Sequence, residues 1–164
     1  IGVANDFRRI GLIRNPTNFG TSTVASADTR RQLYAAIFSS VSGTFTADEE
    51  INQASTGAVG KVVEYDSTNK ILYFYQTRFP DCGTDSNGNL TAFSGANAIT
   101  GQSSSASATP DTSNSTTTNG AVFVSGYSNP ELAFDSGDII YVEERSPITR
   151  ASDQTENIKL IIEF

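Results

Sequence analysis

The chain has 164 residues, which is enough for one ordinary domain or for a domain with a modest insertion, but not for two large domains. Its net charge of −7 excludes a nucleic-acid binder, because neutralising phosphates requires an excess of clustered Lys and Arg. No stretch approaches the roughly 20 apolar residues of a membrane helix, so membrane insertion is not expected. The sequence opens on Ile1 and contains no Met, and we therefore expect it to be part of a longer chain.

The first strand is predicted at residues 7–14, where apolar residues and Arg alternate on both faces of an extended chain. Asn15-Pro16 ends this strand, because Pro cannot donate to a sheet ladder. Further along, Ser26 or Asp28 is placed to cap a short helical turn. Residues 33–41 predict a second strand, although their two Ala and the two preceding Arg also suit a helix, so the helix stays open as an alternative.

The clearest local structure is a β-hairpin with arms at residues 60–65 and 71–76. β-branched and aromatic residues dominate both arms, and residues 66–70 supply turn-forming Asp, Ser and Asn between them. Shorter apolar segments at 45–51 and 97–101 flank this hairpin. Together they predict a small β-barrel or roll.

The region after the hairpin is rich in hydroxyl side chains. Between residues 101 and 118, eleven of the eighteen residues are Ser or Thr, and no large apolar side chain is present, which predicts a solvated loop or linker. Two strong strands follow, at residues 138–144 and 157–164, and the crossover between them spans 145–156.

The predicted fold class is mainly β with little helix. Framework strands from both ends of the chain form an antiparallel β-sandwich, and the small β-barrel or roll is inserted between them. The predicted division is a framework at 1–41 and 119–164, which is the carboxyl end of a larger protein, an inserted module at 42–101, and the Ser/Thr-rich loop at 102–118.

The sequence contains no His, so a Ser-His-Asp or Cys-His nucleophile has no base and a zinc site lacks its commonest nitrogen ligand. The acidic residues at 48–50 and 143–144 are neighbours on strands and point to opposite faces, which favours solvated edges over a glycosidase pair. Residues 85–89 resemble a calcium loop only superficially, and a Gly-Asn turn explains them better. Cys82 is a lone cysteine and is expected to be a small buried side chain. We predict no catalytic residue, cofactor or metal, hence no enzyme and no small-molecule substrate.

Two groups of side chains are candidates for binding. Tyr73 and Tyr75 can form an aromatic surface that stacks on a sugar or peptide, although alternating aromatic residues in a strand are more often sheet core. Several Arg are candidate anchors of a protein interface, because Arg is enriched at interface hot spots, whereas surface pairing with Asp and Glu is the alternative.

Both ends of the chain resemble one known family. The stretches YSNPEL (127–132), SGDIIYVEERSPI (136–148) and DQTENI (153–158) are similar to the carboxyl end of the baseplate wedge protein, gene product eight, of T-even-type contractile-tailed phages. FRRIGLIRNP at 7–16 resembles the strand and Asn-Pro corner that precede that end. The residues between 16 and 127 have no counterpart in this resemblance, and their β strands resemble modules that recur in large phage structural proteins. Ser146 and Glu144 depart from the family pattern.

The resemblance implies a non-catalytic, dimeric β-sandwich subunit of the tail baseplate that joins other wedge proteins, located in the virion and assembled in the host cytoplasm. The alternative is a carbohydrate- or receptor-binding β module of a phage adsorption apparatus. The interfaces are expected on the crossover and the inserted module, and the candidate interface residues are Arg8, Arg9, Arg145, Pro147, Ile148, Arg150 and Asp153.

Overall fold

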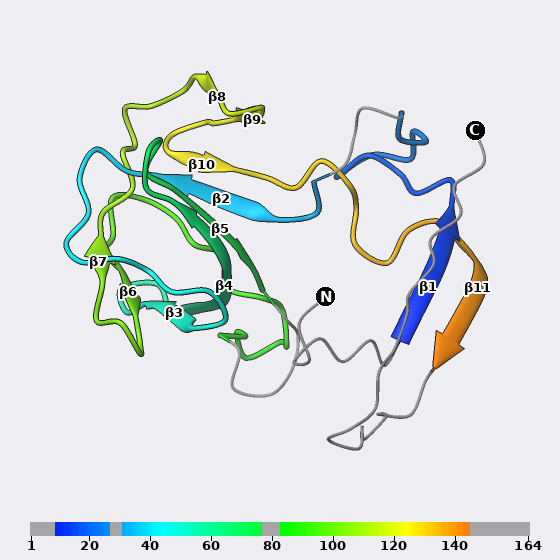
Figure 1. The fold of residues 1–164 in the computed structure, drawn as a ribbon, viewed down its shortest axis with the longest axis horizontal. Helices are drawn as coiled ribbons and strands as arrows, with labels where there is room; N and C mark the ends of the chain where they lie inside the picture. Colours follow the sequence, from blue (N-terminus) through cyan, green and yellow to red (C-terminus); the bar gives the residue numbers. More distant parts are fainter. Residues whose placement is uncertain (1–8, 27–30, 77–82, 145–164) are drawn as a thin grey trace, which may run out of the picture. The chain divides into compact units, whose positions relative to one another are not determined.

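The computed structural model describes residues 9–26, 31–76 and 83–144, and every regular element in these ranges is a β-strand (Figure 1). All strand pairs are antiparallel, which confirms the mainly β, antiparallel fold class. None of the described residues belongs to a helix long and apolar enough to cross a membrane. The strands are β1 (Arg9–Arg14), β2 (Tyr34–Ile37), β3 (Glu50–Gln53), β4 (Ala58–Asp66), β5 (Ile71–Tyr75), β6 (Ile99–Gly101), β7 (Ser107–Ala108), β8 (Thr117–Thr118), β9 (Ala121–Val122), β10 (Tyr127–Ser128) and β11 (Asp138–Glu144).

The chain divides into two compact units. We call Ile1–Asn15 together with Gly137–Phe164 the end unit, and Pro16–Ser136 the barrel unit. This division does not follow the predicted boundaries at 41/42 and 118/119. β2 and β10, which were assigned to the framework, are strands of the same sheet as β4 and β5, because β2 pairs with β5 and β10 pairs with β2.

In the end unit, β1 pairs with β11 from Arg9 opposite Glu144 to Arg14 opposite Asp138, with one irregularity after Leu12. Strands near both ends of the chain therefore share one antiparallel ladder, as expected of the framework, for the residues that are described. Arg14 Nη2 donates to Asp138 Oδ2 at 3.2 Å at the end of the ladder. We call this pair of strands the terminal ribbon. The sandwich expected around it remains a prediction.

The barrel unit is built on a seven-stranded sheet with the order β10-β2-β5-β4-β3-β6-β7 (Figure 1). The sheet curls back on itself, because the chain beyond β7 forms bridges with the chain beyond β2. Ser42 and Ser107 exchange two backbone hydrogen bonds of 2.9 Å, and Asp111 N donates to Ile37 O at 2.9 Å. A barrel or roll is therefore present, but its sheet also includes β2, β7 and β10, which lie outside the predicted bounds of 42–101.

The sheet has a core on each side of β2 and β5, since successive side chains of a strand point to opposite faces. Leu72 and Phe74 point into the barrel, and Ile71 and Tyr73 point outward. Ala35 and Ile37 of β2 lie on the same outward face, Ala121 and Phe123 cover it, and Leu33 packs against this cluster. The buried residues of the barrel interior are Ala36, Phe38, Phe45, Ile51, Ala58, Val62, Leu72, Phe74, Phe93, Ile99, Ala106 and Ala108.

The β4–β5 hairpin is present as predicted. A bulge leaves Val63 unpaired, so that Val62 and Tyr65 both face the barrel interior although they are three residues apart. In the turn, Asp66 Oδ1 accepts hydrogen bonds from the backbone N of Thr68 at 2.9 Å and of Asn69 at 3.1 Å. Segment 33–41 is extended, so its helical alternative is wrong, and part of the helical turn predicted after Ser26 lies outside the described residues.

The Ser/Thr-rich segment is not solvated along its whole length, which corrects the prediction. Ala106 and Ala108 are buried in the barrel interior, and Pro110 is buried beside them. Their small side chains let this segment approach the opposite backbone closely, and a Cβ atom built on Gly43 would lie 3.2 Å from Ala106 Cα. The lack of large apolar side chains did not predict solvent exposure here, because the small side chain of Ala is enough to fill this narrow space.

Gly126 and Gly120 offer a matched pair of substitutions. Both have φ near +80°, which costs an L-residue about 1–2 kcal/mol, but only at Gly126 does an added Cβ collide with backbone, 2.7 Å from Asp111 O. We expect Gly126→Ala to lower the free energy of unfolding by about 3 kcal/mol or more and Gly120→Ala by about 1 kcal/mol, measured by denaturant titration. Equal losses would contradict this account of the close approach at Gly126.

Candidate interaction surfaces

The three acidic residues at 48–50 differ in their exposure to solvent. Asp48 and Glu50 are exposed, whereas Glu49 is buried and its carboxylate holds a loop. Glu49 Oε2 accepts from the backbone N of Ser104 at 2.9 Å, and Glu49 Oε1 accepts from Thr46 N at 2.7 Å. Gly101 makes room for this carboxylate, since a Cβ there would lie 2.6 Å from Oε2. Glu49 therefore has a structural role.

Burial alone raises the pKa of Glu49, but the hydrogen bonds that its carboxylate accepts from Ser104, Thr46 and Ser103 outweigh this effect. The pKa in the folded chain therefore lies below the ordinary value of 4.5. A depressed folded-state pKa stabilises the folded chain above the unfolded-state pKa, and this stabilisation is lost as the pH falls from 4.5 through the folded-state value.

We expect Glu49→Gln to lower the free energy of unfolding near pH 7 by about 2–3 kcal/mol, because the charge-assisted hydrogen bonds weaken. The difference from the wild type should shrink as the pH falls below 4.5, and Glu50→Gln should change stability little because Glu50 is exposed. Denaturant titrations at several pH values measure both effects. A Glu49→Gln chain with an unchanged pH dependence would disprove the assignment.

The calcium-like loop at 85–89 is a turn, as predicted. Asp85 Oδ1 accepts hydrogen bonds from the backbone N of Asn87 at 2.8 Å and of Asn89 at 2.9 Å, and Gly88 has φ +77°. These bonds lower the pKa of Asp85, with Asn89 the largest cause. No group of three or more metal-ligating side chains occurs among the described residues.

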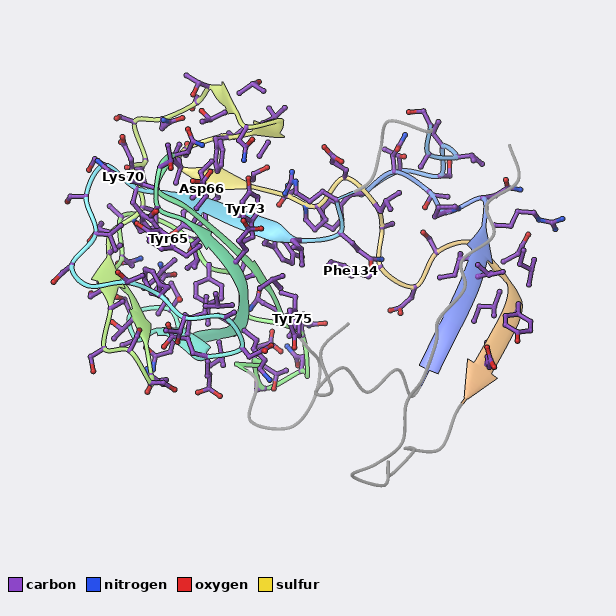
Figure 2. The ribbon with its side chains drawn as sticks, in the orientation of Figure 1. Tyr65, Asp66, Lys70, Tyr73, Tyr75 and Phe134 are labelled. Carbon is purple, nitrogen blue, oxygen red and sulfur yellow. The ribbon has the colours of Figure 1, made fainter. Side chains whose placement is uncertain are left out.

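The two candidate tyrosines differ in accessibility. Tyr73 is only 9% exposed and packs in the outer core, and its hydroxyl accepts a 3.4 Å hydrogen bond from Asn119 Nδ2. Tyr75 is half-buried at the end of β5 away from the Asp66–Lys70 turn (Figure 2). The two rings therefore do not form one open platform, and an aromatic contact through Tyr75 alone remains a prediction.

A buried hydrogen-bond network that sequence reasoning missed joins β3 to β10. Gln53 is fully buried, and its Nε2 donates to Tyr127 Oη at 3.1 Å and to Asn97 O at 2.9 Å. Tyr127 Oη in turn donates to Gly95 O at 2.8 Å. Burial raises the pKa of Tyr127, and the bond from Gln53 partly opposes this. A single Gln in a short polar strand carried no signal of this role.

A groove lies beside β10 in the barrel unit, with a volume of about 510 Å³. Val122 and Val124 form part of its wall and are 62% and 68% exposed. Arg31 is fixed beside them, because its Nη1 donates to Leu33 O at 2.6 Å and its Nη2 donates to Ser128 Oγ at 2.9 Å. We call it the valine groove, and it is lined by Arg31, Val122, Val124, Tyr127, Ser128, Asn129, Pro130 and Glu131.

The terminal ribbon exposes a second set of apolar side chains, which are between 48% and 69% exposed. No residue of the ribbon belongs to either buried cluster of the described chain. The exposed residues are Leu12, Ile13, Ile139, Ile140, Tyr141 and Val142. The sequence contained this signal, since β1 and β11 have apolar residues on both faces.

Most of the predicted interface residues lie outside the described residues, and their roles stay predictions. Arg9 is the first residue of β1, but its side chain is not described. The residues outside the description are Arg8, Arg145, Pro147, Ile148, Arg150 and Asp153, and Cys82 lies outside it too.

Residues 80–164, more than half of the chain, match the model of the Phage-Gp8 family, described as Bacteriophage T4, Gp8. The chain belongs to the Phage-Gp8 family. No curated protein and no solved structure matches significantly. The match includes residues 80–126, which corrects the prediction that everything between 16 and 127 lacks a counterpart in the family. Phage-Gp8 is a baseplate wedge family, so the chain is a structural protein of a T4-like phage baseplate.

Proposed function

We propose that this Phage-Gp8 chain acts as a subunit of the baseplate wedge through protein–protein interfaces and catalyses no reaction. Its partners are other wedge proteins and a second copy of the chain, and it is assembled into the tail in the host cytoplasm. Family membership supports the wedge assignment. The observation that carries the interface role is the valine groove, where two highly exposed Val lie beside a fixed guanidinium.

The valine groove has the physical properties of an interface centre. Apolar side chains in a concave surface gain from desolvation when a partner covers them, and Arg is enriched at such centres. The Arg31 guanidinium is already ordered by its bonds to Leu33 and Ser128, so little side-chain entropy is lost on binding. Burial lowers the pKa of Arg31, and Glu131 opposes this effect.

A second interface is proposed on the crossover at 145–156 of the end unit, with Arg145, Pro147, Ile148, Arg150 and Asp153 as candidate contacts. Under this proposal the end unit belongs to the framework of the wedge and the barrel unit is an accessory module. A carbohydrate-binding role has little support, because the ring of Tyr73 is buried.

Substituting the groove tests this function. We expect Val122→Asp combined with Val124→Asp to reduce incorporation of the chain into assembled baseplates by at least about tenfold, because two charged side chains would have to be desolvated where the partner meets apolar ones. The variant should keep the wild-type unfolding midpoint, since both side chains are exposed. Quantitative mass spectrometry of baseplates made with each variant is the measurement.

Val63→Asp is the matched control, because Val63 is an exposed Val on the bulge of β4 and does not line the groove. It should be incorporated as well as the wild type. If all variants enter baseplates equally, the groove is not a partner interface. If the control fails as well, the effect is not specific to the groove.

A further inference from the structure

The guanidinium of Arg31 in the valine groove is held by uncharged groups. Its Nη1 donates to Leu33 O at 2.6 Å, and its Nη2 donates to Ser128 Oγ and to Asn129 O, both at 2.9 Å. A guanidinium has five N–H donors, so these bonds use three of them. The side chain is therefore fixed in position, while two of its donors have no acceptor in the described chain.

The positive charge of Arg31 also has no ion-pair partner among the described residues. Glu131, the acidic residue of the groove, instead accepts a hydrogen bond from the backbone N of Arg31 through its Oε2 at 2.9 Å. Burial lowers the pKa of Arg31 although the charge of Glu131 opposes this effect. The charge is thus only partly compensated within the chain, and a partly buried cation with two remaining donors favours a carboxylate as its partner.

The two valines beside Arg31 are presented on a fixed strand. Ala121 and Phe123 point inward and are each 1% exposed. Val122 and Val124 alternate with them and therefore point outward together. The backbone N of Val124 donates to Tyr127 O at 2.8 Å, which ties this strand to β10. The groove therefore combines a preformed apolar wall with a preordered cation.

We infer that the valine groove binds a protein segment that presents a carboxylate to Arg31 and apolar side chains to Val122 and Val124. This inference rests on the proposed function, in which the groove is a wedge interface, and adds the chemistry of the partner. The planar guanidinium matches the geometry of a carboxylate. A small free anion would contact Arg31 but leave both valines in water, whereas an acidic and apolar segment covers the cation and the valines together.

Opposite charges placed on the groove wall test the charge of the partner. We expect Val124→Glu to reduce incorporation of the chain into assembled baseplates at least about tenfold and Val124→Lys less than about threefold, because only the first repels a partner carboxylate. Both variants should keep the wild-type unfolding midpoint, since Val124 is 68% exposed. Quantitative mass spectrometry of baseplates made from equal mixtures of variant and wild-type chains is the measurement.

Val63→Glu and Val63→Lys are the matched controls outside the groove, and both should be incorporated as well as the wild type. If Val124→Lys is reduced as much as Val124→Glu or more, the groove is an interface but its partner is not acidic, and this inference is overturned. If neither variant is reduced, the groove is not an interface, and the proposed function fails as well.

Carbodiimide cross-linking tests the contact itself, because this reagent joins a lysine amine to a carboxylate that lies against it. In baseplates that contain Val124→Lys, we expect an amide between position 124 and an Asp or Glu of another chain, at least about fivefold more abundant than any from Val63→Lys. Peptide mass spectrometry separates this product from an intrachain link to Glu131. Baseplates that contain Val124→Lys but give no such interchain amide would overturn the inference.

Discussion

The barrel unit depends on the close backbone approach at which the sheet closes, between Ser42-Gly43 and Ala106-Ser107. The reciprocal 2.9 Å bonds of Ser42 and Ser107 form only because no large side chain separates the two segments, and Gly43 faces Ala106 at the tightest point. Closure gives the β7 edge of the sheet a backbone partner and encloses the interior core. The rest of the unit, including the outer core over β2 and β5, is built on this curled sheet.

Buried polar side chains fix the loops around the closed sheet. Glu49 holds the loop at 103–106 through bonds to Ser103 and Ser104, and Gln53 ties the loop at 94–97 to Tyr127 of β10. In the described chain no buried side-chain N or O lacks a hydrogen-bond partner. The apolar side chains exposed in the described residues, those of the valine groove among them, are the candidates for partner contacts. This arrangement suits a baseplate protein whose contacts must be specific.

The strands and turns that depend on neighbouring residues could be predicted from the sequence. The β4–β5 hairpin follows from its β-branched arms and Asp66 turn, and the positions of β1 and β11 follow from their extended, apolar sequence patterns. The position of the Ser/Thr-rich segment was not predictable, because its burial depends on Ala106 and Ala108 facing a narrow interior that only the closed sheet creates. The valine groove was missed for a similar reason, since Val122 and Val124 come together with Arg31 only in the folded chain.

Family membership identifies a structural protein. Because its curled sheet is closed, we expect the barrel unit to unfold as a single cooperative unit. In this unit the Ser/Thr-rich segment forms part of the wall, and residue-resolved amide hydrogen exchange on the full chain tests this. The hydrogen-bonded amides of Gly101, Ser107 and Asp111 should exchange as slowly as those of β4 and β5. Exchange of these three amides at the rate of an unstructured peptide, while β4 and β5 stay protected, would contradict it.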